Sequence, residues 1–320
     1  MRPVSSNSPF RLRRLQDQSP LHPNFAGSDI SIAAIAPDRC DSAVTQWCDD
    51  HLVMRNPMVS ARNQLFLFLC GSYGTPTHQK RITSLAANMG YHAINLSYPN
   101  SWTVGGLCRD ATDTNCHGKL RLDILDGGNR SGLIDIGRKN SIEARLYALL
   151  NLLSSSRTDQ GWEQFCCGSH CIDWSKVVVA GHSQGGGQAA IIGKTYQVLR
   201  VVMLAAPVDF VRTINQHADW ISAEGVTPTE RYFGFVHSDD EGFDRILECW
   251  KLMRLDDSAI AVVDQSDSAF KQSRRLVTRI KNVRRGKYHA CVAQDNLTPI
   301  GTQGQPVFEP VWHYLLNAHA

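Results

Sequence analysis

The sequence lacks the features that mark membrane, exported and nucleic-acid-binding proteins. No run in its 320 residues reaches the roughly eighteen consecutive apolar residues that a membrane span requires. Residues 1–30 are polar and arginine-rich, without the apolar centre of a secretory signal, so cytoplasmic localisation is the default expectation. The formal net charge of +3 is close to balance and indicates no charged partner. These absences exclude a membrane span and give no support to a nucleic-acid partner.

One basic cluster lies between residues 271 and 287, but no aromatic residues are interleaved with its charges. Nucleic-acid surfaces of the single-stranded type use such aromatics to stack bases. We therefore interpret the cluster as a solvated face of a helix or loop. Its members are Lys271, Arg274, Arg275, Arg279, Lys281, Arg284, Arg285 and Lys287.

The cysteine content indicates a different cellular compartment from the one that the N-terminal sequence suggests. There are ten cysteines, and the close pairs Cys40/Cys48 and Cys108/Cys116 could close small disulfide loops in loop-like sequence. Such usage favours an oxidising compartment, so a secreted or periplasmic protein is the alternative to a cytoplasmic one. Residues 166–171 hold Cys, Cys, His and Cys but no paired C-x-x-C halves. A disulfide or buried thiols, rather than a zinc site, are expected there.

The chain divides into two parts by pattern. Residues 1–60 carry scattered prolines and no sustained hydrophobic period, so we expect an irregular N-terminal extension. Residues 61–320 alternate short apolar runs with helical patterns, which is typical of a single α/β domain. Within it, residues 101–139 are rich in Gly, Asp and Asn and are expected to be a long loop insertion. This insertion is either a wall or lid of a substrate pocket or a plain surface loop.

Periodicity places the elements of the second part. Their alternation predicts an α/β fold with a doubly wound, mostly parallel sheet flanked by helices. The predicted strands cover residues 65–69, 91–97, 177–180, 201–204, 232–236 and 260–263, and the predicted helices cover 79–89, 141–153, 184–199, 241–253 and 307–316.

The most informative stretch follows the strand at 177–180. It reads Gly-His-Ser-Gln-Gly, with Ser183 between Gly181 and Gly185, and a helical pattern follows at once. A strand, a tight turn and a helix form the context that a nucleophile elbow requires. Glycines on both sides of the serine avoid collisions in so tight a turn. We therefore predict that Ser183 is an exposed nucleophile.

An elbow serine needs a base and an acid in the chain order Ser, Asp or Glu, His. His289 lies in a glycine-bearing loop after the last predicted strand, which is the place expected of the base. The strand at 232–236 lies two after the elbow strand and ends close to Asp239 and Asp240. We favour Asp240 as the acid, although spacing does not separate it from Asp239. Asp209, one strand earlier, is the reserve candidate.

The negative charge that develops during acyl transfer needs preorganised donors. The N–H of Gln184, at the start of the helix, is the first predicted donor of an oxyanion hole. The second should come from the loop after the strand at 65–69, where Gly71 allows close approach to the backbone. Ser72 N–H is the preferred donor and Tyr73 N–H the second choice.

These residues together resemble those of the α/β-hydrolase superfamily, in particular esterase- and lipase-like members without a separate cap domain. The resemblance rests on Gly71 to Gly74, Gly181 to Gly185, Asp240 and His289 in that order, and it extends over about residues 61–320. One departure is the oxyanion loop, which reads Cys-Gly-Ser-Tyr-Gly rather than His-Gly-Gly-Gly.

The resemblance implies hydrolysis of a carboxylic ester or related acyl bond of a small molecule. Ser183 would attack, His289 would carry the proton, and Asp240 would hold the imidazolium, with no metal or organic cofactor. An acyltransferase, thioesterase, peptidase or lipase on the same fold is an alternative, and so is a catalytically silent ligand-binding protein. A serine, an acid and a histidine in order favour the enzyme, because a binding protein needs none of them.

Overall fold

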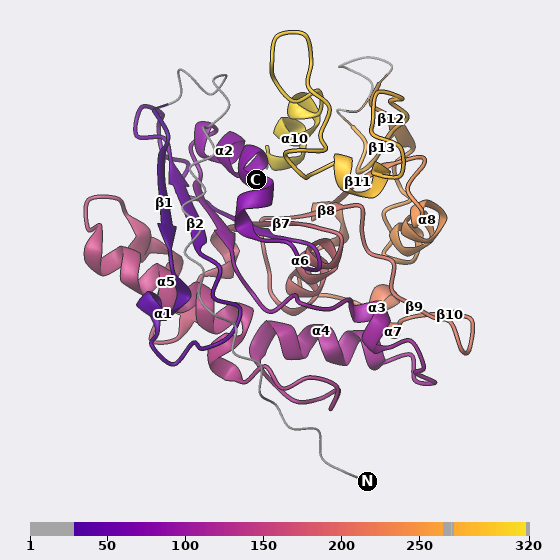
Figure 1. Cartoon of the computed structure of the whole chain (residues 1–320), viewed down its shortest axis with the longest axis horizontal. Helices are drawn as coiled ribbons and strands as arrows, with labels where there is room; N and C mark the ends of the chain where they lie inside the picture. Colours follow the sequence, from indigo (N-terminus) through magenta and orange to yellow (C-terminus); the bar gives the residue numbers. More distant parts are fainter. Residues whose placement is uncertain (1–28, 265–269, 271, 318–320) are drawn as a thin grey trace.

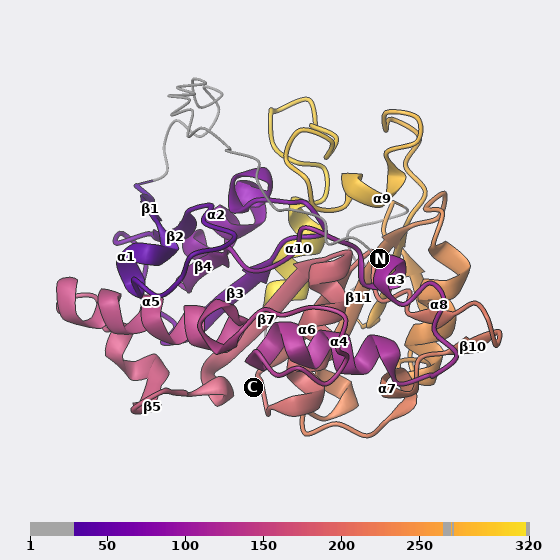
Figure 2. The same cartoon turned by 60° about the horizontal axis from the view of Figure 1, so that its bottom comes forward.

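The computed structural model describes residues 29–264, 270 and 272–317, which form one central sheet of nine strands between helical layers (Figures 1 and 2). The order along the sheet is β1-β2-β4-β3-β7-β8-β11-β13-β12, and two short ribbons, β5–β6 and β9–β10, lie outside it. The strands are β1 (Ser31–Ile35), β2 (His51–Arg55), β3 (Leu65–Leu69), β4 (His92–Leu96), β5 (Cys166–Gly168), β6 (Cys171–Ile172), β7 (Val177–His182), β8 (Arg200–Leu204), β9 (Phe210–Val211), β10 (Gln216–His217), β11 (Tyr232–His237), β12 (Ile260–Val262) and β13 (Arg275–Thr278).

The middle of the sheet is parallel and buried. Strand β3 reads Leu-Phe-Leu-Phe-Leu, and all of its residues are buried, as are those of β7. Strands that are apolar at consecutive positions suit a parallel sheet covered on both faces. Along the order β4-β3-β7-β8-β11-β13-β12, every pair of neighbouring strands is parallel. Only the β1–β2 and β2–β4 pairs of this sheet are antiparallel. The predicted doubly wound, mostly parallel sheet is confirmed.

Helices cover both faces of the sheet. Helix α2 contacts α10 on one face, while α4 packs against α5 and α6 on the other (Figures 1 and 2). No helix in the described part of the chain is long and apolar enough to cross a membrane. The helices are α1 (Pro37–Cys40), α2 (Lys80–Asn88), α3 (Val104–Leu107), α4 (Cys116–Asp126), α5 (Ile142–Ser156), α6 (Gln184–Thr195), α7 (Asp219–Ser222), α8 (Phe243–Leu252), α9 (Tyr288–Cys291) and α10 (Glu309–Leu316).

The expectation of an irregular extension over residues 1–60 is wrong for residues 31–55; residues 1–28 lie outside the described part. Strands β1 and β2 pair with each other, and β2 also pairs with β4, so this segment forms one edge of the central sheet. The strands are short, and β1 is largely exposed, so neither leaves a sustained alternating pattern in the sequence. Tertiary pairing, rather than a local pattern, forms this edge.

The insertion at residues 101–139 is not simply a loop, because it contains helices α3 and α4. Helix α4 was missed because polar side chains are buried on it beside the apolar ones, so no amphipathic pattern marks it. Its buried polar residues are His117, Arg121 and Asp123. The carboxylate of Asp123 accepts hydrogen bonds from the backbone N–H groups of Arg130 and Ser131, which organises the following turn.

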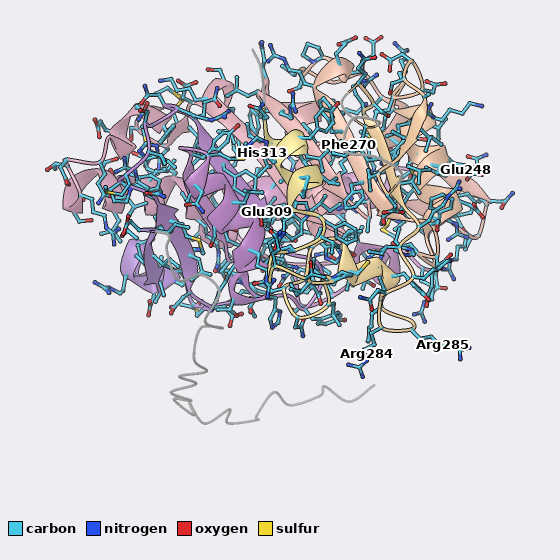
Figure 3. The ribbon with its side chains drawn as sticks, turned by 90° about the horizontal axis from the view of Figure 1, so that it is seen from above. Glu248, Phe270, Arg284, Arg285, Glu309 and His313 are labelled. Atoms are coloured by element: carbon cyan, nitrogen blue, oxygen red, sulfur yellow. A yellow bond between two sulfur atoms is a disulfide. The ribbon has the colours of Figure 1, made fainter. Side chains whose placement is uncertain are left out.

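The basic cluster is also more structured than predicted. Strand β13 runs through it and carries Arg275, while Arg274 is only 7% exposed, so a solvated helix or loop face is wrong for these positions. Lys271 lies outside the described residues. Arg284 and Arg285 do follow the prediction, since they are exposed and project from the connection between β13 and α9 (Figure 3).

Two disulfides join cysteines that are close in sequence. The Cys108–Cys116 bond was among the predicted pairs and links the end of α3 to the start of α4. The second disulfide, Cys167–Cys171, spans the β5–β6 ribbon, in the segment where a disulfide or buried thiols were expected rather than a zinc site. The Cys40/Cys48 pair was wrong, because both thiols are free. Disulfides persist in oxidising environments, so the two bonds are compatible with a secreted or periplasmic protein.

A buried guanidinium attaches the N-terminal edge to the core. Arg145, on α5, is 1% exposed and donates to the backbone carbonyls of Gln46, Trp47, Ser97 and Asn140. Burial lowers the pKa of Arg145 to about 10, so the side chain stays charged at neutral pH. Carbonyls from three chain segments thus share one cation, and removing it takes a donor away from each of them.

We therefore expect Arg145→Met to lower the free energy of unfolding by about 3 kcal/mol or more, because buried carbonyls lose their donor. Urea unfolding followed by circular dichroism measures the change. Arg157→Met is the matched control, since Arg157 ends the same helix and its side chain makes no hydrogen bond within the described residues. Equal stability of the two variants would contradict this role for Arg145.

Candidate active site

The turn between β7 and α6 places Ser183 at the carboxyl end of the sheet. Ser183 has a φ of 56°, in the left-handed region that non-glycine residues rarely adopt. A Cβ on Gly185 would lie 2.0 Å from the carbonyl oxygen of Leu69, and one on Gly181 would lie 2.2 Å from the Gly185 oxygen. Only glycine fits at these two contacts, so the sequence of the turn follows from how closely the helix approaches the strands.

Three predicted residues meet at this turn. The Nε2 atom of His289 lies 2.8 Å from Ser183 Oγ, and its Nδ1 atom lies 2.8 Å from Asp240 Oδ2. Because a carboxylate only accepts hydrogen bonds, Nδ1 carries the proton and Nε2 is free to accept from the serine hydroxyl. The structure thus brings Ser183, His289 and Asp240 into one hydrogen-bonded chain.

The position of Asp240 is set by the loop that follows β11. Its Oδ1 accepts from the Gly242 N–H at 2.8 Å, which leaves Oδ2 for His289. The Asp240 side chain is 1% exposed. Asp239 points away to Lys281, whose ammonium hydrogen-bonds its carboxylate and lowers the Asp239 pKa. The structure therefore separates two neighbours that spacing alone could not.

His182 hydrogen-bonds the backbone of His289, the candidate base. Its Nε2 lies 2.9 Å from the His289 carbonyl oxygen, so this nitrogen must donate. Burial, reinforced by the charge that His289 can carry, lowers the pKa of His182 to about 3. The ring therefore stays neutral at physiological pH and keeps the tautomer that holds the short helix α9, on which His289 lies.

Asn100 fixes the loop after β3 through hydrogen bonds to its backbone. The Asn100 side-chain amide donates to the carbonyls of Gly71 and Gly74, and the Asn100 backbone carbonyl accepts from Tyr73 N–H at 2.8 Å. Tyr73 N–H, the second choice as oxyanion donor, is thus already engaged. Ser72 N–H makes no hydrogen bond among the residues that the structure describes, and Ser72 lines the same pocket as Ser183.

Gln184 contributes to the site through both its backbone N–H and its side chain. As the first residue of α6, its N–H has no carbonyl one turn earlier to bond. Its side-chain oxygen accepts from the Ser72 hydroxyl at 2.8 Å and from Val104 N–H at 3.3 Å. The Gln184 side chain therefore fixes both the loop that carries Ser72, the second predicted donor, and the start of helix α3.

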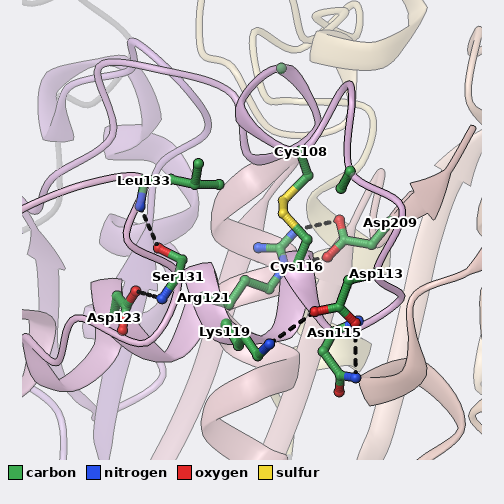
Figure 4. Close-up of a disulfide and its surroundings, with 12 residues drawn as sticks. Cys108, Asp113, Asn115, Cys116, Lys119, Arg121, Asp123, Ser131, Leu133 and Asp209 are labelled. Atoms are coloured by element: carbon green, nitrogen blue, oxygen red, sulfur yellow. Dashed lines mark hydrogen bonds and ion pairs between the residues drawn. A yellow bond between two sulfur atoms is a disulfide. The ribbon is translucent and has the colours of Figure 1, made fainter. Parts of the chain in front are cut away.

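Asp209, the reserve acid, has a different partner. Its two carboxylate oxygens lie 2.6 and 2.7 Å from Nε and Nη2 of Arg121 (Figure 4). Trp220 Nε1 also donates to this carboxylate, at 2.9 Å. Burial would raise the pKa of Asp209, but the Arg121 guanidinium outweighs it and holds this pKa below its usual value. Arg121 also donates to the Gln184 carbonyl, so the ion pair joins α4 to the helix of the candidate nucleophile.

A pocket of about 540 Å³ opens over these groups. The insertion at 101–139 forms one wall through α3 and α4, as one of the two expectations for it proposed. The remaining walls come from the loops after β8 and β11 and from α8. Its lining residues are Ser72, Thr103, Val104, Gly105, Gly106, Arg109, His117, Arg121, Ser183, Gln184, Val208, Asp209, Phe210, Arg212, Asp240, Glu241, Gly242, Arg245 and His289.

Sequence reasoning missed two residues that shape this site. Asn100 was not among the predicted site residues, although it follows β4, the parallel neighbour of β3, and the ends of adjacent parallel strands meet. That placement was a usable signal. Arg121 gave none, because a single arginine in a stretch without helical periodicity does not reveal a buried ion pair.

Asp209→Ala should lower the free energy of unfolding by about 3–5 kcal/mol, because it leaves Arg121 buried without its counter-ion. Since the pKa of Asp209 is lowered in the folded state, this contribution is present above the ordinary aspartate pKa and is lost as pH falls below it. Urea unfolding at neutral and acid pH measures both effects. Asp239→Ala, which removes an exposed ion pair with Lys281, should leave stability almost unchanged. A similar effect of both substitutions would argue against this structural role.

No protein-family model matches the chain, and no curated protein matches it in sequence. Solved structures that it resembles include esterase B from Lactobacillus rhamnosis, at 12% identity and a TM-score of 0.44, over 78% of this chain and 76% of that one. A thermostable esterase from Pseudomonas putida shares 15% identity at a TM-score of 0.35, over 78% and 73%. A bacterial heroin esterase shares 14% at 0.39, over 78% and 75%. These are distant likenesses, and the proposal below rests on the chain's own residues.

Proposed function

We propose that the protein is a serine hydrolase that cleaves a carboxylic ester or a related acyl bond of a small molecule. The observation that carries the proposal is the position of the His289 imidazole, whose two nitrogens lie 2.8 Å from Ser183 Oγ and from Asp240 Oδ2. A nucleophile, a base and an orienting acid within hydrogen-bond reach of one another form the arrangement that activates a serine.

The hydrogen-bond directions support the following proton transfers. His289 Nε2 takes the hydroxyl proton as Ser183 Oγ attacks the acyl carbon, and Asp240 stabilises the imidazolium that results. The same imidazolium then protonates the leaving alcohol, which yields an acyl-enzyme. Water, activated by His289 in turn, releases the acid and restores Ser183. No step in this sequence uses a metal or an organic cofactor.

The N–H groups of Ser72 and Gln184 are the proposed donors to the oxyanion. Both residues line the pocket beside Ser183, and neither N–H has an acceptor within the described residues. Donors that are fixed before the reaction stabilise the developing charge without reorganising, and one such donor is typically worth about 10²–10³ in rate. The Gln184 side chain, bonded to the Ser72 hydroxyl, supplies that fixed geometry.

A fluorophosphonate probe tests the nucleophile, because it labels only activated serines. We expect the wild type to be labelled and Ser183→Ala to lose the label. Ser156→Ala is the matched control, since Ser156 is exposed at the end of α5, away from the pocket, and should not affect labelling. Absence of labelling in the folded wild type would refute the hydrolase and leave a ligand-binding protein as the alternative.

The acid is tested by Asp240→Asn, which preserves shape but favours the wrong tautomer of His289. With 4-nitrophenyl butyrate as substrate, we expect kcat to fall by at least about 10³-fold. Asp239→Asn should change kcat by less than about twofold, because Asp239 pairs with Lys281 outside this chain of hydrogen bonds. Comparable losses in the two variants would show that the acid is assigned wrongly.

A further inference from the structure

Three arginines line the candidate active site without taking part in the proposed chemistry. Arg109 follows α3, Arg212 follows β9, and Arg245 lies on α8, so each comes from a different wall of the pocket. A cation beside a reactive serine is not needed for ester hydrolysis itself. The three positive charges therefore call for a separate explanation.

None of the three charges has a carboxylate partner within the part of the chain that the structure describes. Their side chains make no ion pair or hydrogen bond within the residues that the structure describes, although Arg245 lies over the ring of Phe210 at 4.6 Å. Arg121, the fourth arginine of the lining, differs because Asp209 holds it through two hydrogen bonds. Arg109, Arg212 and Arg245 thus keep their guanidinium donors available.

The acidic residues of the lining do not offset these charges. Asp209 is bound to Arg121, and Asp240 is buried against His289. Glu241 is exposed and is the remaining carboxylate of the lining. Three guanidinium groups without a carboxylate partner therefore face a single free carboxylate around the pocket, which gives its interior an excess of positive charge.

Contacts within the fold restrain the backbone beside Arg109 and the side chain of Arg245, whereas Arg109 and Arg212 are exposed. Arg109 directly follows Cys108, which the disulfide to Cys116 ties to α4 (Figure 4). Arg245 projects from a helix and stacks on Phe210, two residues before Arg212. The contact with Phe210 restrains the Arg245 side chain, which therefore loses less entropy when it binds a ligand than a freely mobile side chain does.

We propose that the substrate of this enzyme carries an anionic group, of the carboxylate or phosphate type, beside the bond that is cleaved. This inference rests on the proposed hydrolase function and names its substrate class. The guanidinium fork matches the geometry of such anions and binds them through paired hydrogen bonds. An excess of positive charge in a pocket also raises the rate at which anionic ligands enter it.

The test compares matched esters that differ in one charge. The first pair is 4-nitrophenyl hydrogen adipate and 4-nitrophenyl hexanoate, which place or omit an anion on the acyl side. The second pair is 4-acetoxybenzoate and 4-acetoxybenzamide, which do so on the alcohol side. For each pair we measure the ratio of kcat/KM for the anionic ester to that for the neutral one, in the wild type and in the triple variant Arg109→Ala, Arg212→Ala, Arg245→Ala.

We expect a ratio of at least about tenfold in one pair for the wild type, the effect of one good charge-assisted contact. The ratio should fall towards one in the triple variant and should decrease as salt is added to the wild type. Arg39→Ala, which removes an exposed arginine from α1 outside the pocket, should keep the wild-type ratio. Inhibition of the neutral ester's hydrolysis by adipate, compared with inorganic phosphate, shows which anion is preferred.

A neutral ester that is hydrolysed as well as its anionic partner in both pairs would overturn this inference and leave the hydrolase intact. So would an unchanged ratio in the triple variant. Failure of the proposed function has a different signature, because the folded wild type would then neither react with the fluorophosphonate probe nor hydrolyse any of the four esters. The two failures are therefore distinguishable.

Discussion

The close contact between the first turn of α6 and the ends of β3 and β7 determines where the candidate catalytic groups lie. Gly185 lies so near the Leu69 carbonyl that no side chain fits between them, and Ser183 adopts its unusual φ as a result. Parallel strands end at the same edge of a sheet. The loops after β3 and β11 therefore reach the same point and bring Ser72 and Asp240 to the serine.

Buried polar contacts then hold the less regular parts of the chain around this edge. Arg121 bonds Asp209 and the Gln184 carbonyl, which couples the insertion to the helix that begins at the nucleophile. Arg145 does the same for the N-terminal strands through backbone carbonyls. Such contacts cost desolvation and are strict about geometry. They position segments whose own sequences carry little information about their structure.

The pocket combines two kinds of charge arrangement. Close to Ser183, both oxygens of the Asp240 carboxylate have hydrogen-bond partners, so its orientation is set before a ligand arrives. Farther out, Arg109, Arg212 and Arg245 have no carboxylate partner among the described residues. This contrast is what links the reaction to a class of substrate, because fixed groups suit bond cleavage and free cations suit recognition.

The sequence by itself determined the parallel core and singled out Ser183 and His289 as candidate nucleophile and base, because continuous apolar strands and a glycine-bounded turn are local patterns. It also predicted the Cys108–Cys116 bond from spacing. Only the tertiary structure separated Asp240 from Asp239, because that choice depends on which carboxylate faces His289 across the sheet edge. The same holds for β1, β2 and α4, whose stability comes from pairing and buried ion pairs between distant residues, and such long-range contacts leave no periodic trace in the sequence.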